Sequence, residues 1–344
     1  RMHPTLWPFF TIAIAALAKI FIICFIGAML VRYRIIEESL LKGLGRLLLY
    51  VFLPALLFSK LSRNINVSQM VKLWVLPLSA ILYILAGLVL SFLLRRLFVK
   101  DNDQRRLFVA AASLANSGYL PMMLMVNICD FSSALGGTAD VGQQAIALIS
   151  IYILGFTPML WGVAYPYLSE HSLSRDILRK VINPPFIAIL AGVFCGMVPG
   201  IGETLWDRNL PFYVVMSSLS SIGTLALPCA MIVLGGNLAY GPGKSRVPVR
   251  FLCGVGLIRY CAVPAVAVGW LAMITHFGWI QPDPLLALVI LLEAAMPPAT
   301  NLVVITQALD RGAKRMAAIL FWMYILALIT LTIYTAWALA YVTG

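Results

Sequence analysis

The sequence has little charge and few of the residues that build catalytic or metal centres. Charged residues make up 11% of the 344 positions, against about 25% in a typical soluble domain. The three histidines lie far apart, and no HExxH, P-loop or paired acid motif stands within an apolar stretch. The six cysteines include no CxxC pair, which excludes a zinc knuckle and a disulfide scaffold. We therefore expect no enzyme, no catalytic residue, no metal ligand and no cofactor.

Basic residues exceed acidic ones, but no part of the chain is a basic domain. The formal net charge is +12, and the basic residues stand in short clusters between apolar runs. No basic arm could follow a phosphate backbone, so nucleic acid is not an expected partner. Apolar residues make up 62% of the chain, an excess that no aqueous surface explains. The lipid bilayer must therefore be the solvent for most of the protein.

Apolar runs of membrane-spanning length divide the whole sequence. A helix needs about 20 apolar residues to cross the hydrocarbon core, and ten runs are of that order. No connection between them is long enough for a soluble domain. The sequence therefore predicts an all-α integral membrane protein of ten transmembrane helices, at 6–31, 43–61, 73–94, 107–129, 144–165, 184–201, 211–239, 247–275, 285–309 and 317–342.

The basic clusters predict the orientation of these spans. The connections on one face of the membrane carry 18 basic residues, whereas the opposite face, which includes both termini, carries 5. Basic loops stay in the cytoplasm, so both termini are expected outside it. The membrane would be the inner membrane of a bacterium or, in a eukaryote, the endoplasmic reticulum or plasma membrane.

Prolines recur in the same order about half a chain apart. Pro54 is matched by Pro228, Pro77 by Pro264, and Pro121 by Pro297 or Pro298. Two five-helix repeats, residues 1–168 and 169–344, explain this order. Because five is odd, the second repeat enters the membrane inverted relative to the first. Two similar halves of opposite orientation can exchange conformations, which is the basis of alternating access in secondary transporters.

Spans four and nine contain helix-breaking residues near their middle. Span four holds NSGYLP at 116–121, and span nine holds EAAMPPATN at 293–301. Proline lacks an amide donor, while Gly118 tolerates non-helical backbone. Unwound backbone persists in a membrane only where it is buried in protein or lines a wet cavity. Both breaks are therefore expected to meet at a binding site, where half-helix N-termini favour a carboxylate; the alternative is that the prolines only kink packed helices.

Five segments resemble the auxin efflux carrier family. They are residues 292–307 (LEAAMPPATNLVVITQ), 182–185 (INPP) and 232–238 (IVLGGNL), and, most like the PIN-likes branch and its bacterial relatives, 116–121 (NSGYLP) and 317–324 (AAILFWMY). The resemblance covers nearly the whole chain. It implies two inverted five-helix repeats, with spans four and nine as broken crossover helices at the substrate. The long cytoplasmic loop of the plant plasma-membrane carriers is absent, which puts regulation by phosphorylation in doubt.

The resemblance also implies a mechanism and a class of substrate. Spans one, two, six and seven would form a scaffold and the contact of a homodimer. Spans three to five and eight to ten would form a transport domain that moves as an elevator. The family carries organic acids, notably auxin (indole-3-acetic acid) in plants and malate- or malonate-type acids in bacteria. We expect an organic anion as substrate, an auxin-like aromatic carboxylate first and a small carboxylate as the alternative.

The residues of the two breaks are the candidate binding site. Asn116 and Asn301 would donate amide hydrogen bonds to the substrate carboxylate; alternatively they would tie loose carbonyls of the broken backbone. Tyr152 and Tyr324 would help to wall a pocket for an aromatic acid. The full set of predicted substrate-binding residues is Asn116, Ser117, Gly118, Tyr119, Pro121, Pro297, Pro298, Thr300 and Asn301.

Three charged residues stand inside apolar spans. Each needs a partner, a wet cavity or a route to the interface, because a charge at mid-bilayer costs about 2.5–3.5 kcal/mol. Glu293 would carry a coupling proton or complete a sodium site, or it would only neutralise Lys19 or Arg259. Arg259 would attract the anionic substrate or extend to the interface. Lys19 is expected in a structural ion pair. A channel or a membrane sensor remains the alternative of another class.

Overall fold

The computed structural model describes residues 6–65, 72–135, 139–169, 180–243, 245–309 and 312–343. Within these ranges every regular element is a helix, apart from one isolated bridge between two loops. The elements are α1 (Trp7–Arg32), α2 (Glu38–Leu47), η1 (Leu48–Phe52), α3 (Leu53–Asn64), α5 (Val75–Phe98), α6 (Asn102–Ser113), α7 (Tyr119–Phe131), η2 (Ser133–Leu135), α8 (Ala139–Met159), η3 (Leu160–Ala164), α9 (Tyr165–Ser169), α11 (Pro184–Met197), α12 (Ile201–Trp206), α13 (Phe212–Thr224), α14 (Ala226–Ala239), α15 (Val249–Leu257), η4 (Ile258–Ala262), α16 (Val263–His276), α17 (Pro284–Ala295), α18 (Asn301–Ala308) and α19 (Ala313–Thr343).

Among the described residues, seven helical segments are long and apolar enough to cross a membrane. They are α1, α2 with η1 and α3, α5, α8 with η3 and α9, α13 with α14, α15 with η4 and α16, and α19. Helices α7, α11 and α17 are apolar but shorter. The predicted all-helical membrane protein is confirmed. The count of ten spans and their division into two inverted repeats stay predictions.

Three prolines inside long helical segments follow a π-helical turn. The segments η1, η3 and η4 directly precede Leu53-Pro54, Tyr165-Pro166 and Val263-Pro264. In each, the amide of the residue before the proline donates five residues back, as Leu53 does to the Leu48 carbonyl. The wider turn makes room for the proline ring, which lacks a donor and clashes with a regular α-turn. The segments therefore continue through these prolines with a local widening.

Side-chain caps begin two of the shorter apolar helices. The Asn183 side-chain oxygen accepts from the Phe186 amide at 3.0 Å, at the start of α11. The Asp283 carboxylate accepts from the Leu286 amide at 2.8 Å, at the start of α17. Each cap is followed by proline at the first helical position, where its missing N–H leaves no partner unsatisfied.

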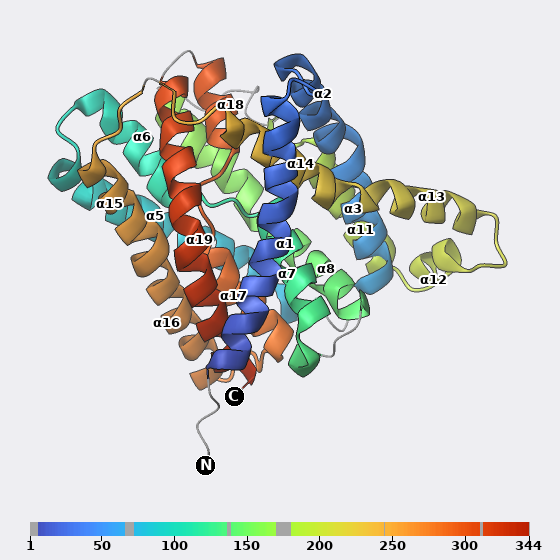
Figure 1. Cartoon of the computed structure of the whole chain (residues 1–344). Coiled ribbons are helices and arrows are strands. Elements are labelled where there is room, and N and C mark those ends of the chain that lie inside the picture. The colour runs from blue at the N-terminus through green and yellow to red at the C-terminus, as the bar shows by residue number, and fades with distance from the viewer. Residues whose placement is uncertain are drawn as a thin grey trace.

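Helix α17 lies at the centre of the molecule (Figure 1). All ten residues from Leu286 to Ala295 are buried, and the helix contacts α5, α8, α16 and α19. A helix that is apolar on every side is stable only when neighbours cover it completely. The end of α17 therefore places the second break in the interior.

Glycines allow some helices to approach closely. A Cβ atom at Gly235 on α14 would overlap the backbone of Cys24 on α1, and one at Gly155 on α8 would overlap the backbone of Pro77. Small residues at such contacts are typical of helix packing in membranes, where lipid provides no hydrophobic force between helices. The contact between α1 and α14 is thus a backbone-to-backbone contact.

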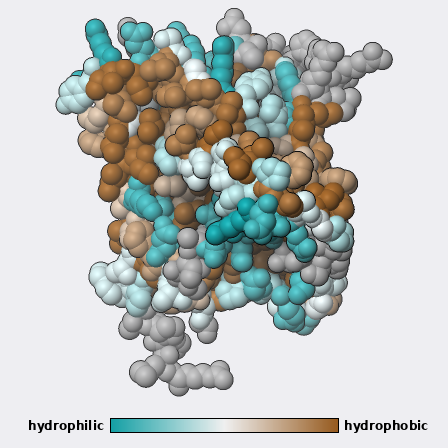
Figure 2. Space-filling view, turned by 90° about the vertical axis from the view of Figure 1, so that its right-hand side faces the viewer, coloured by the Kyte–Doolittle hydropathy of each residue, from teal (hydrophilic) through white to brown (hydrophobic). Residues whose placement is uncertain are grey.

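The outer surface is rich in large apolar side chains. Exposed examples on α11 and α13 are Ile187, Leu190, Phe194, Phe212, Val214 and Val215. Figure 2 shows the side of the molecule that carries these helices, with hydrophobic side chains over much of its upper part and a hydrophilic band below. An apolar surface of this extent fits contact with lipid tails or with another apolar protein surface.

Candidate functional site

Both predicted breaks are interruptions between two helices. The first lies between Ser113, the last residue of α6, and Tyr119, the first of α7. The second lies between Ala295, at the end of α17, and Asn301, at the start of α18. Each gap is too short for a loop that leaves the protein interior, and most of its residues are buried. The two gaps are therefore unwound backbone inside the molecule.

The two breaks pair with each other through the backbone. The Asn116 amide donates to the Pro297 carbonyl at 2.8 Å, and the Ala299 amide donates to the Leu114 carbonyl at 2.9 Å. These bonds form an antiparallel bridge at Ala115. They satisfy buried amides that the broken helices no longer pair, which is the condition for unwound backbone at membrane depth.

The antiparallel pairing decides which helix ends adjoin. Leu114, directly after α6, pairs with Ala299, directly before α18; Asn116, before α7, pairs with Pro297, after α17. Helices α7 and α18 therefore begin at the breaks from opposite directions. Each helix start carries amides without an intrahelical partner and the positive end of a helix dipole.

The starts of α7 and α18 are accessible, whereas the centre of the pairing is buried. Gly118, Tyr119 and Thr300 are half-buried, and Asn301 is exposed. A Cβ atom at Gly118 would have no neighbour within 4 Å. A ligand can therefore approach the amides at these two helix starts, and their charge suits an anion.

Asn116 binds another residue of the protein. Its side-chain amide donates to the Tyr324 hydroxyl of α19 at 2.7 Å, and Asn116 is only 8% exposed. This contact is neither of the two roles that the sequence suggested, a bond to substrate or a bond to a loose carbonyl. The prolines of the predicted site are buried, Pro121 in the first turn of α7 and Pro297 and Pro298 in the second break.

Arg259 is buried against the breaks and does not reach the interface. It lies in η4 and is 1% exposed. Its Nε donates to the Met296 carbonyl at 2.9 Å, and its Nη2 donates to the Ala294 carbonyl at 3.0 Å. Its Nη1 donates to the carbonyls of Ala112 and Ser113 at 3.3 and 3.1 Å. The alternative in which Arg259 extends to the membrane interface is therefore wrong.

Glu293 is fully buried and its carboxylate is not compensated by a close partner. Both side-chain oxygens lack a hydrogen bond, and the residue is 0% exposed. The Ser117 hydroxyl and the Arg259 guanidinium lie near it, but no hydrogen bond joins either group to the carboxylate. Tyr152 belongs to the same buried group. Buried unpaired carboxylates are costly, so Glu293 is a candidate for holding a proton or a cation.

Lys19 is paired away from the breaks. Its Nζ lies 3.1 Å from an oxygen of Asp130, at the end of α7, and the two side chains are 44% and 39% exposed. The ion pair is the structural role expected for Lys19, but the partner is not Glu293. Asp130 directly follows the predicted span 107–129, and a carboxylate at a span end was the signal for this partner.

A family model described as a membrane transport protein matches residues 12–335. This chain belongs to that family, the auxin efflux carriers. It is thus a membrane transport protein and not an enzyme. The resemblance that the sequence motifs indicated is confirmed.

Plant and yeast proteins resemble this membrane transport protein over most of their length. It is 27% identical to Protein PIN-LIKES 1 of Arabidopsis thaliana, over 92% of this chain and 76% of the relative. It is 24% identical to Protein PIN-LIKES 7 of the same plant, over 94% and 96%. An uncharacterized transporter of Schizosaccharomyces pombe is 19% identical over 89% and 90%.

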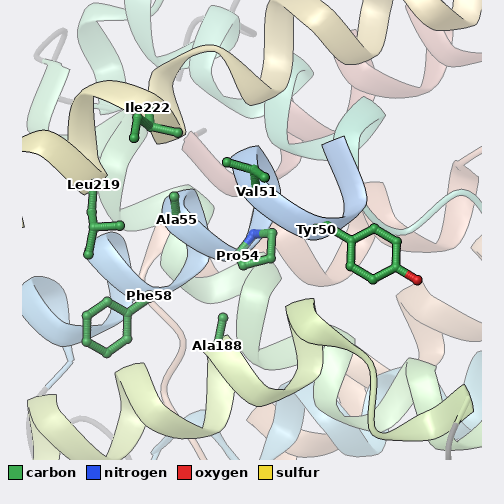
Figure 3. A pocket seen from close by; sticks show the side chains of 8 residues that line it. All are labelled: Tyr50, Val51, Pro54, Ala55, Phe58, Ala188, Leu219 and Ile222. Carbon is green, nitrogen blue, oxygen red and sulfur yellow. The ribbon is translucent and has the colours of Figure 1, made fainter. Parts of the chain in front are cut away.

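The transporter also has a pocket that does not suit an anion. It has a volume of about 320 Å³ and lies between α3 with η1, α11 and α13 (Figure 3). Its lining side chains are Tyr50, Val51, Pro54, Ala55, Phe58, Ala188, Leu219 and Ile222, and none is charged. None of the predicted site residues lines it. The breaks are therefore the better candidate for the site of a charged substrate.

Proposed function

We propose that this protein is a secondary transporter that carries organic anions by alternating access, and that the carboxylate binds at the paired breaks. The observation that carries the proposal is the meeting of two interrupted helices, through Asn116 and Pro297, next to two accessible helix starts. Helix starts in discontinuous membrane helices are a known way to bind an anionic group at membrane depth.

The charge of the helix starts supports an anionic substrate. Each start contributes roughly half a positive elementary charge, and α7 and α18 contribute it from opposite directions. The exposed Asn301 side chain adds amide donors beside one start. Asn116 adds donors beside the other when its bond to Tyr324 opens. A carboxylate has acceptors for several such donors at once.

An auxin-like aromatic carboxylate is the proposed substrate, with malate- or malonate-type acids as the alternative. The half-buried Tyr119 ring, directly after the accessible Gly118, offers an aromatic surface next to the helix starts. Aromatic rings stack on such a surface, whereas a small aliphatic diacid gains nothing from it. Competition between indole-3-acetic acid and malate for uptake distinguishes the two.

The moving part is proposed to comprise spans three to five and eight to ten, sliding as an elevator against a dimeric scaffold of the other spans. Two contacts would then cross the sliding surface between α1 and α7. They are the Lys19–Asp130 ion pair and the bond from the Asn127 side chain to the Ala16 carbonyl at 3.0 Å. Both lie on one stretch of α1 and would have to break in each cycle.

Uptake of labelled acid into proteoliposomes tests the proposal. Removing the side-chain donors with Asn116→Ala or Asn301→Ala should raise the KM for the acid by about tenfold or more, because a hydrogen bond to a charged group contributes about 1.5–3 kcal/mol. Asn209→Ala, on an exposed loop, is the control and should leave KM unchanged.

Two results would count against the proposal. If both site variants kept the KM of the wild type, the acid would not bind at the breaks. If the flux rose with concentration without saturating, and labelled acid did not exchange for unlabelled acid, the protein would be a channel.

A further inference from the structure

The four bonds of Arg259 all go to the C-terminal ends of helices. Ala112 and Ser113 are the last two residues of α6. Ala294 is in the last turn of α17, and Met296 is its C-cap. Carbonyls at helix C-termini have no intrahelical donor, and here they lie inside the protein, away from water. One guanidinium therefore satisfies two carbonyls at the end of each broken helix.

The charge of Arg259 is nearly balanced by the partial charges of the two helix ends. A helix C-terminus carries roughly half a negative elementary charge, so the ends of α6 and α17 together supply about one, opposite to the single charge of Arg259. Four of the five N–H donors of the guanidinium are used in these bonds. Little capacity is left for a substrate carboxylate.

Unwound carbonyls and half-helix C-termini are also the groups that hold a sodium ion in many secondary transporters. Here the same kind of groups surround a side chain that is always charged. We propose that Arg259 is a tethered cation that takes the place of a coupling sodium ion and joins the two broken helices. The protein then needs no sodium ion at this point, either for stability or for transport.

The position of Arg259 argues against a simpler role. It is anchored on η4, a third element that belongs to neither broken helix, and it reaches both. Its neighbour Glu293 makes no ion pair with it within 4.0 Å, so the guanidinium is not there only to neutralise an acid. Arg259 is a positioning residue, because it acts on the substrate site through the backbone of the two breaks.

Thermal unfolding of the purified protein in detergent tests the inference without any substrate. The melting temperature is measured in choline chloride and, at equal ionic strength, in sodium chloride or methylguanidinium chloride. The wild type should melt at the same temperature in choline and in sodium. Arg259→Ala should melt lower in choline and regain part of the loss, saturably, with sodium or methylguanidinium. Arg63→Ala, which removes an exposed arginine, should show no such recovery.

A second variant protects the test if Arg259→Ala does not fold. Arg259→Lys keeps the charge with fewer donors, so it should melt below the wild type and remain insensitive to sodium. A sodium response of Arg259→Lys, a lack of cation recovery in Arg259→Ala, or a saturable sodium response of the wild type would each overturn the inference.

A transport measurement gives a second test, and it rests on the function proposed above. Uptake by the wild type should be equal in sodium-containing and sodium-free medium, and saturable dependence on sodium would overturn the tethered-cation role. If the wild type transported no organic acid at all, the carrier proposal would fail, and the melting experiment would still decide the role of Arg259.

Discussion

Two buried charged residues lie close together at the breaks, but only one of them has hydrogen-bond partners. Arg259 is surrounded by carbonyls that satisfy its guanidinium, whereas the Glu293 oxygens have no hydrogen-bond partner. The charge of Arg259 is matched by two helix ends, so it is not free to compensate Glu293 fully. We therefore propose Glu293 as the group whose charge changes during transport, by binding and releasing a proton.

Replacement of Glu293 by its neutral isostere tests this role at the level of one side chain. We expect Glu293→Gln to be purified with a melting temperature near or above that of the wild type, because an uncompensated buried carboxylate costs stability. Its uptake of acid should lose the pH dependence that the wild type shows. Initial rates at several pH values measure this.

The matched control is Glu203→Gln, which removes an exposed carboxylate on α12. This variant should keep the pH profile of the wild type. A profile of Glu293→Gln that follows the wild type, with a normal rate, would remove Glu293 from the coupling step.

The contact partners of single residues could not be predicted from the sequence. The bonds of Arg259 join it to backbone carbonyls 35 to 147 positions away. A carbonyl has no residue type, so no pattern in the sequence identifies it as a partner. Asp130 and Tyr324 do have recognisable side chains, but they lie 111 and 208 positions from Lys19 and Asn116, and the sequence does not show that these residues meet.

At the scale of elements, proline and glycine were the residues that predicted where helices are interrupted. Gly118 and the Pro297-Pro298 pair indicated where two helices stop, because each disfavours or prevents regular helical bonding there. Other prolines do not interrupt a helix. Pro54 and Pro264 follow π-turns inside long helical segments, while Pro77 and Pro228 lie in the first turns of α5 and α14. Only the neighbouring residues and the packing separate these cases.

The close contact of α1 and α14 provides a test of helix packing. A Cβ atom at Gly235 would overlap the backbone of Cys24, so Gly235→Ala must push the two helices apart. Overpacking of this kind costs about 1–3 kcal/mol and should lower the melting temperature clearly. Gly269→Ala, on α16, is the matched control, because its Cβ would meet nothing within 4 Å.

The two glycine variants are compared by thermal unfolding in the same detergent. Gly269→Ala should melt at or slightly above the wild-type temperature, since alanine favours the helix over glycine. Equal melting temperatures for the two variants would show that α1 and α14 do not pack backbone to backbone.

At the scale of the whole molecule, composition was enough to predict the class of protein. The excess of apolar residues required a membrane, and seven long apolar helical segments meet that requirement. Helix α1 begins and α19 ends at the same end of the molecule (Figure 1). The orientation in the membrane stays a prediction; five of the basic residues counted for it, Arg1, Arg175, Arg179, Lys244 and Arg311, lie outside the described residues.

The division into a scaffold and a moving domain stays a proposal because it concerns motion and a second protomer. The paired breaks lie beside α17, in the interior, whereas the apolar surface of α11 and α13 is on the outside. A substrate site in the interior and a contact surface on the outside are compatible with an elevator carried by a dimer.

The most direct test of the account is an electron cryo-microscopy map of the protein with bound acid, either indole-3-acetic acid or malate, whichever is taken up. The account predicts both helices interrupted, and the carboxylate within hydrogen-bonding distance of the first amides of α7 and α18. Density for the acid in the apolar pocket beside α3, or helices that run unbroken through 113–119 and 295–301, would contradict it.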